Sequence, residues 1–425
     1  MTALLERFSK NWIRFISYSI VTSMILLLIE YLNDVLGFTV PAVFTYFSTR
    51  MILAAVTTLT LSIFLGPRFI KKLYEWKIGQ SIRMDECPLL GKLHEKKQDT
   101  PTMGGLLMLS SMLIALFLWM DLTHVFTLAL FGVTVVLGGL GAYDDYLKLK
   151  YRNTKGVSAK KKLLCQVIFS GVLATYLLCP AVAEGVHHGR WFAPPVVKEQ
   201  IAESDDAMQS LTLQEYAGRV YVPFYKEPVV QFGGIFLLMA ALFTIFVVTG
   251  SSNAVNLTDG LDGLATGCLI IVASCLALIA FVSNNVTIAS YLNILYIEGS
   301  GEIAIYLCAF VGACLGFLWY NGYPAQVFMG DTGSLALGGV IGVATVLLRR
   351  ELLLGIVGGI FVAEAASVIV QVLSYRYRNK KRVFLCAPLH HHFEYKGWPE
   401  TKVVLRFWIV GLLLAIIGIA SLKFQ

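Results

Sequence analysis

Long apolar runs constrain this chain more than any other feature of its sequence. A helix needs about 20 mostly apolar residues to cross the hydrocarbon core of a bilayer. We identify ten such runs: residues 49–70, 104–121, 125–143, 163–181, 232–250, 262–283, 303–319, 335–348, 354–374 and 403–423. Charged residues make up only 14% of the chain, against about 25% in soluble domains. The sequence therefore predicts an all-α polytopic membrane protein with about ten transmembrane helices.

Two apolar runs fit this pattern less well. The run 335–348 is short, which predicts a tilted or broken helix. The run 16–36 is interrupted by Glu30, Asn33 and Asp34, so it is either an eleventh span or a helix lying in the membrane interface. No signal peptide is predicted, and the scattered cysteines are interpreted as small core residues rather than as disulfide or zinc partners.

The polar connections differ in charge along the chain. Three are rich in Lys and Arg: 71–102, 144–162 and 375–402. Two are mainly acidic: 182–229 and 284–302. Because short basic loops stay in the cytoplasm, we predict the basic connections there, together with 250–262 and 320–334. The net charge of +7 is thus explained by membrane orientation and not by a nucleic-acid partner. We expect one integral membrane domain, 1–425, with 182–229 as an external insertion.

Acidic residues stand at the ends of predicted spans. Asp144 and Asp145 end the run before them, where they repel each other and oppose the helix dipole. Such a placement is typical of a site that holds a cation or carries out chemistry, and two solvated surface acids are the alternative. Lys148 and Lys162 on the same loop could neutralise phosphates. Asp331 lies between Gly residues in a turn that could approach a ligand closely, or could be simple turn punctuation.

The segment 253–264 places Asn256, Asp259 and Asp262 at every third position. On a helical turn they would share one side, where amide and carboxylate groups suit a nucleobase edge or a ribose. The alternative is a re-entrant turn with Asp262 as the N-cap of the next helix. An EF-hand is excluded by the spacing of the acids and by the missing terminal Glu.

Two more basic connections carry groups suited to phosphate. Lys97 and Thr102 lead into a Gly-Gly helix start, whose N–H groups could bind an anion, and an ordinary start with Thr102 as N-cap is the alternative. Three adjacent histidines, His390 to His392, do not form a typical zinc pattern. Imidazoles can bind phosphate or carry protons. The alternative is a histidine cluster at the membrane interface with no chemical role.

These groups all lie in the loops predicted to be cytoplasmic. Together they suit an anionic phosphate substrate with a divalent ion, because oxygen ligands favour Mg²⁺ or Mn²⁺. An ion-coupled transporter is the more distant alternative, since acids within membrane segments also mark ion pathways. The acids here cluster at loop ends on one side instead of at mid-span, which favours an enzyme.

The same loops resemble those of the bacterial phospho-N-acetylmuramoyl-pentapeptide transferases, within the polyprenyl-phosphate N-acetylhexosamine-1-phosphate transferase superfamily. The motifs follow in the family's order: Thr100-Pro-Thr-Met-Gly-Gly105, Asp144-Asp-Tyr-Leu-Lys148, Asn253–Leu264, Asn321–Ser334 and Pro388-Leu-His-His-His-Phe-Glu394. The last motif points to the peptidoglycan branch. Departures from the family are the extended N-terminus, the insertion 182–229 and Gln98-Asp99.

This resemblance implies transfer of phospho-MurNAc-pentapeptide from UDP-MurNAc-pentapeptide to undecaprenyl phosphate, giving lipid I and UMP at the bacterial inner membrane. It implies Mg²⁺ as cofactor and Asp331 as its ligand. The implied catalytic residues are Asp144, Asp145, Asp331, His390, His391, Lys148 and Lys162. The implied substrate-binding residues are Lys97, Thr102, Asn256, Asp259, Asp262, Asn321, Phe328 and Gln371. The resemblance leaves two alternatives: the protein could form a homodimer, and the donor could be another UDP-N-acetylhexosamine, as in teichoic acid or O-antigen initiation.

Overall fold

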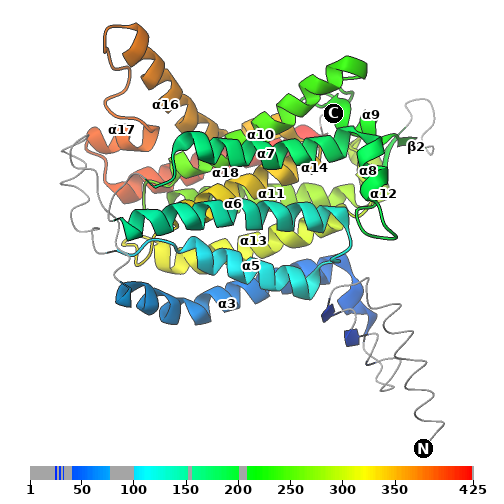
Figure 1. Cartoon of the computed structure of the whole chain (residues 1–425), viewed down its shortest axis with the longest axis horizontal. Coiled ribbons are helices and arrows are strands. Elements are labelled where there is room, and N and C mark those ends of the chain that lie inside the picture. Colours follow the sequence, from blue (N-terminus) through cyan, green and yellow to red (C-terminus); the bar gives the residue numbers. More distant parts are fainter. Residues whose placement is uncertain are drawn as a thin grey trace, which may run out of the picture.

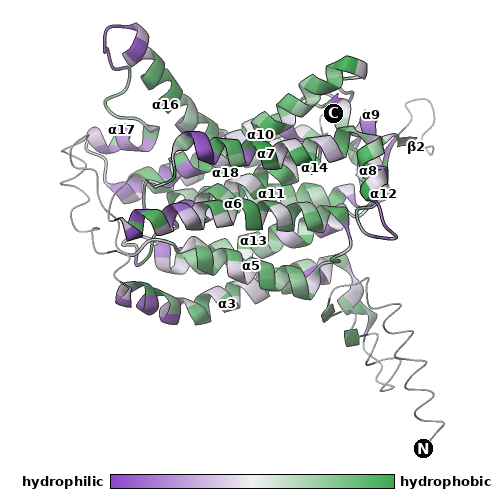
Figure 2. Ribbon diagram, in the orientation of Figure 1, coloured by the Kyte–Doolittle hydropathy of each residue, from purple (hydrophilic) through white to green (hydrophobic). Residues whose placement is uncertain are grey.

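The computed structural model describes residues 24, 25, 28, 29 and 32, and then 41–76, 100–151, 156–200 and 208–423. Within these residues the chain is a bundle of long helices lying side by side (Figure 1), with short strands gathered at one end. Hydrophobic residues line the bodies of the helices, and hydrophilic residues gather near their ends (Figure 2). The prediction of an all-α polytopic membrane protein is confirmed.

Nine of the described helices are long and apolar enough to cross a membrane. They are α3 (Phe47–Glu75), α6 (Val125–Lys150), α7 (Ala159–Leu178), α10 (Leu237–Thr258), α11 (Leu264–Ser283), α13 (Ser300–Asn321), α14 (Gly330–Leu347), α16 (Gly359–Tyr377) and α18 (Glu400–Lys423). A tenth apolar helix, α5 (Gly105–Trp119), is shorter. Each of the ten predicted runs overlaps one of these helices, whereas the run 16–36 lies outside the continuously described residues.

Helix α14 lies at the centre of the bundle. It packs chiefly between α6 and α10, and every residue from Thr332 to Leu347 is buried. The predicted tilt or break in 335–348 is therefore not needed to explain its shortness. The helix begins five residues earlier, at Gly330, because the supposed turn Gly330–Ser334 already forms its first helical turn.

The predicted run 354–374 is divided in the structure. A short helix, α15 (Glu351–Val357), ends before Gly358, and α16 continues from Gly359. Figure 1 shows α16 leaving the bundle, with the chain returning through α17 (Leu389–Tyr395). Gln371 on α16 holds this return, since its amide accepts from the N–H groups of Val383 and Phe384 and donates to the carbonyl of Phe384.

The insertion 182–229 and the connection 284–302 meet at one end of the bundle. Their elements are α8 (Pro180–Val186), β1 (Val197–Gln200), β2 (Met208–Leu211), α9 (Leu213–Gly218), β3 (Arg219–Val220), β4 (Val230–Gln231), α12 (Val286–Leu292) and β5 (Tyr296–Ile297). Strand β1 pairs antiparallel with both β2 and β5. Buried Arg349 donates to the carbonyl of Arg219, which fixes the insertion at the C-terminal end of α14. The N-terminal end of α14, with Asp331, lies at the opposite end of that helix.

Candidate active site

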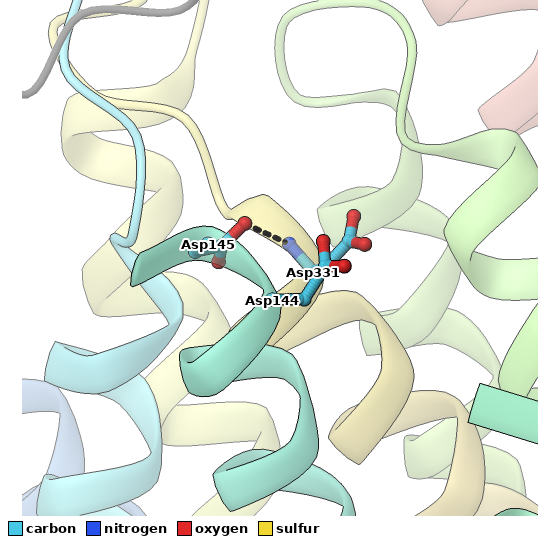
Figure 3. Close-up of side chains that lie close together, drawn as sticks. All are labelled: Asp144, Asp145 and Asp331. Carbon is cyan, nitrogen blue, oxygen red and sulfur yellow. Dashed lines mark hydrogen bonds between the residues drawn. The ribbon is translucent and has the colours of Figure 1, made fainter. Parts of the chain in front are cut away.

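The candidate site forms where the end of α6 meets the beginning of α14 (Figure 3). Gly141 on α6 makes this meeting possible, because a Cβ atom there would lie 2.2 Å from the carbonyl oxygen of Asp331. Helix α6 extends beyond the predicted run 125–143, so that Asp144 and Asp145 lie inside its last turns and not after them. Both side chains are buried, with exposed fractions of 0% and 2%.

Asp145 caps the N-terminus of α14. One of its oxygens accepts from the Asp331 N–H at 3.2 Å, the bond drawn in Figure 3. The other accepts from the N–H and the hydroxyl of Thr332, at 2.9 and 2.7 Å. The first N–H groups of a helix lack partners within it, and its N-terminus favours negative charge. Asp145 therefore fixes the start of α14, and with it the position of Asp331.

Asp144 and Asp331 share two lysines. Lys148 Nζ lies 2.6 Å from Asp144 and 3.1 Å from Asp331. Lys162 Nζ, from α7, lies 2.9 Å from Asp144 and 2.5 Å from Asp331. The predicted catalytic acids and lysines thus converge. With Asp145 included, three carboxylates face two ammonium groups, which leaves the ionised cluster one negative charge in excess.

The three carboxylates could hold a metal ion. One oxygen from each of Asp144, Asp145 and Asp331 lies within 4.8 Å of the others. A set of carboxylate oxygens suits a hard cation such as Mg²⁺. The excess negative charge of the cluster points the same way, so the residues present fit a divalent ion.

Asn256 joins this cluster from α10. Its side-chain amide donates to Asp331 at 3.0 Å and to Ser334 at 2.8 Å. Asp259 follows where α10 ends, at Thr258. Burial raises the pKa of Asp259 to about 7, and repulsion from Asp331 and Asp145 adds to the effect. The negative charges of Asp331 and Asp145 therefore act on Asp259.

The prediction that Asn256, Asp259 and Asp262 share one side of a helix is wrong. Because α10 ends at Thr258, Asp262 lies beyond the helix and accepts from the N–H of Ala325 at 3.0 Å. The alternative of Asp262 as an N-cap is wrong too, since Gly263 holds that position of α11 with a φ of +77°.

Two other predicted binding residues, Asn321 and Phe328, lie at the two ends of the connection between α13 and α14. Asn321 is buried and bonds to the protein itself: its side chain accepts from Gly263 and Thr266 and donates to the carbonyl of Val327. Phe328 is half-buried, and its backbone is hydrogen-bonded to the segment before α5.

Thr102 lies in that segment, beside the start of α14. A Cβ atom at Gly330 would lie 2.8 Å from the Thr102 hydroxyl oxygen. Thr102 does not cap α5, whose N-cap is Gly104. Lys97 lies outside the described residues.

The histidines lie on α17. His391 Nδ1 is 2.7 Å from a carboxylate oxygen of Glu394. His390 is completely buried against Glu364 of α16 and Gly260, next to Asp259. The importance of Glu364 was missed at the level of sequence, although an acid inside an apolar run is a recognisable signal. The side chain of Gln371 is hydrogen-bonded to the backbone of residues 383 and 384.

Comparisons with known proteins agree with these motifs. The model of glycosyl transferase family 4 matches residues 127–349, which include all three aspartates of the cluster. A protein of Protochlamydia amoebophila named phospho-N-acetylmuramoyl-pentapeptide-transferase is 70% identical over 410 residues, covering 95% of this chain and 100% of that protein. Proteins with the same name from Desulfotalea psychrophila and Endomicrobium trichonymphae are 42% and 46% identical. They align with 90% and 91% of this chain, and with 95% and 96% of their own lengths.

Proposed function

The chain belongs to the phospho-N-acetylmuramoyl-pentapeptide-transferase family, and we propose that it transfers phospho-MurNAc-pentapeptide from UDP-MurNAc-pentapeptide to undecaprenyl phosphate. The products are lipid I and UMP. The observation that carries this proposal is the partly buried cluster of three carboxylates and two lysines at one end of a bundle of apolar helices. A membrane-boundary site gives a lipid acceptor and a water-soluble nucleotide donor access to the same atoms. We place the protein in the bacterial inner membrane with this end facing the cytoplasm, because the described residues of the basic connections 144–162 and 375–402 lie at this end.

Asp331 is our candidate for the principal Mg²⁺ ligand, with Asp144 beside it. Asp331 combines a fixed backbone, held by Asp145, with a carboxylate that already faces cationic groups. Mg²⁺ bound there would screen the negative charge of the reacting phosphates. Thr102, Asn256, Asp259, Asp262 and Phe328 are proposed to line the donor site. Asn321 and Gln371 would act there indirectly, by holding the loops to which they are bonded.

Charge screening is the main task of the chain's own residues. The acceptor is a phosphate monoester with a second pKa of about 6, so it is mostly a dianion at neutral pH. It needs little help from a general base, but it must approach an anionic diphosphate. Lys148 and Lys162 lie where they can offset that repulsion. We therefore propose direct attack of the lipid phosphate on the β-phosphorus of the donor, with UMP leaving.

A covalent route is the alternative, in which Asp144 attacks the donor first. The contacts of Asp144 favour the direct route. This carboxylate is fully buried, lies within 2.9 Å of both lysines, and accepts from the N–H of Val157 at 2.6 Å. An anion held by so many positive or donor groups is a poor nucleophile. Its proposed role is to orient the acceptor and the cation.

Two measurements test the proposal. Purified protein is offered UDP-MurNAc-pentapeptide and UDP-GlcNAc together with undecaprenyl phosphate, and we expect lipid I as the product. Exclusive use of UDP-GlcNAc would assign the chain to a related transfer instead. Single-turnover mixing without lipid acceptor then separates the two routes. Release of UMP equal to the amount of enzyme would refute direct attack.

A further inference from the structure

Glu364 is an acidic residue buried on the apolar helix α16. Its exposed fraction is 0%, and no Lys or Arg forms a salt bridge with it among the residues that the structure describes. An ionised carboxylate is costly to bury unless nearby groups stabilise it. Among the described residues, the carboxylate of Glu364 has its hydrogen-bond and ion-pair partners on His390. Its buried carboxylate is therefore placed to act on that histidine.

The two residues are joined at two points. The backbone N–H of His390 donates to Glu364 Oε1 at 3.1 Å and to Oε2 at 3.4 Å. The ring nitrogen Nδ1 of His390 lies 3.1 Å from Oε2. The backbone bond fixes the start of α17 against α16, whereas the Nδ1 contact is an ion-pair approach without the geometry of a hydrogen bond. A carboxylate facing Nδ1 also favours a proton on that nitrogen, which leaves Nε2 for another partner.

The Nε2 atom of His390 faces the turn that follows α10. A Cβ atom on Gly260 would lie 2.3 Å from Nε2, so the ring reaches this turn only because residue 260 has no side chain. Nε2 is buried and makes no hydrogen bond to the described part of the chain. Leaving a buried polar atom without a partner is unfavourable. A ligand entering beside Asp259 would supply the missing partner.

We propose that Glu364 is a positioning residue, which holds His390 so that its Nε2 hydrogen-bonds a β-phosphate oxygen of the bound nucleotide sugar. This inference rests on the proposed function, and it adds Glu364 and Gly260 to the residues that shape the donor site. Glu364 touches no substrate in this arrangement and acts only through the imidazole. The β-phosphate is the group that distinguishes the donor from UMP, which has only the α-phosphate.

The first test compares Glu364→Gln with the wild-type enzyme. Glutamine keeps the size of the side chain and an acceptor for the His390 N–H, but removes the charge facing Nδ1. Because hydrogen bonds that involve charged groups are worth more than neutral ones, we expect kcat/KM to fall about 10- to 100-fold. The affinity for UMP should stay within about twofold, since UMP lacks the β-phosphate. Glu364→Asp, which keeps the charge, should recover part of the loss.

Ser367→Ala is the matched control, because Ser367 is buried one turn further along the same helix and donates to the backbone carbonyl of Glu364, not to its carboxylate. It should leave both kcat/KM and UMP affinity nearly unchanged. An equal loss of UMP binding in Glu364→Gln would indicate general damage to the site and would overturn the inference. Wild-type kcat/KM in Glu364→Gln would overturn it as well.

A double-mutant cycle tests whether Glu364 acts through His390. If it does, the double variant Glu364→Gln/His390→Gln should be no slower than His390→Gln alone. If the losses in kcat/KM of the two single variants multiplied in the double variant, the positioning role of Glu364 would be refuted. Gly260→Ala, which pushes on Nε2 while leaving Glu364 intact, should reproduce the loss in kcat/KM with UMP binding retained. If the wild-type protein turned over neither UDP-sugar, the proposed function itself would be refuted. Normal wild-type turnover with additive variants would refute only the role of Glu364.

Discussion

Replacing Asp145 by Asn tests whether this residue works by positioning α14. The carboxylate accepts three hydrogen bonds from the first turn of that helix, and an asparagine has only one accepting oxygen. If that oxygen faces Thr332, the amide NH₂ must face the N–H of Asp331, so one bond becomes a contact between two donors. Asp145→Asn keeps the size of the side chain, so the change is limited to charge and hydrogen bonding.

The magnitude follows from the lost contacts. A hydrogen bond to a charged group contributes about 1.5–3 kcal/mol, and a charge at a helix N-terminus adds about 0.3–1 kcal/mol. Together these give about 2–4 kcal/mol at the start of α14. If most of this appears as misplacement of Asp331 during the reaction, the rate should fall on the order of 100-fold. Thr332→Val removes one of the three bonds with little change of shape and should have a smaller effect.

Two measurements are needed to assign the cause. Turnover is measured as UMP release in lipid nanodiscs, and amide hydrogen exchange is followed over residues 328–340. A positioning role predicts that exchange at the start of α14 becomes faster as turnover falls, because its N–H groups lose their acceptor. Slower turnover with unchanged exchange would refute this reasoning and would indicate a chemical role for Asp145.

Further substitutions address the metal, the pH dependence and the opposite end of the bundle. The Asp331→Asn variant should fold and lose turnover. Undiminished Mg²⁺-dependent activity in this variant would refute the assignment of Asp331 as a metal ligand. The raised pKa of Asp259, about 7 against an ordinary 3.8, means that the folded state binds the proton more tightly than the unfolded state. Stability of the ligand-free protein should therefore fall as the pH rises from about 4 to 7, and Asp259→Asn should stabilise it more at about pH 8 than at about pH 4, as followed by thermal unfolding. Arg349→Met leaves buried Glu351 without the partner that lies 2.8 Å away, so the unfolding free energy should drop by about 3–5 kcal/mol. The double variant Arg349→Met/Glu351→Gln should regain part of that loss with the KM for the donor unchanged.

The helices could be predicted from the sequence because membrane thickness sets their length locally. The same local reasoning failed at helix ends, where neighbouring residues compete for one position. Thr102 and Asp262 are good N-caps by residue type, yet Gly104 and Gly263 take those positions. Asp262 instead binds a loop far away in sequence, which no local pattern indicates.

The candidate site was predictable as a set of residues but not as an arrangement. Asp144, Asp331 and the two lysines converge as expected. The helix-capping role of Asp145 depends on the approach of α6 to α14, and the burial of His390 depends on Glu364 of α16. Both contacts join segments distant in sequence, so they follow from packing of the bundle and not from residue spacing.

The charges of the cluster give a physical reason to expect a divalent cation in the reaction. Lys148 and Lys162 are already paired with Asp144 and Asp331, and the cluster as a whole carries one excess negative charge. An acceptor dianion adds about two further negative charges, and the diphosphate of the donor is anionic as well. The two lysines cannot offset all of these charges, because part of their own charge is neutralised within the protein. A hard dication among the carboxylates would restore the balance and leave the lysines free to face the phosphates. The lysines and the cation should therefore act as one charge-screening unit, so removing either should slow turnover more than it weakens the affinity for UMP.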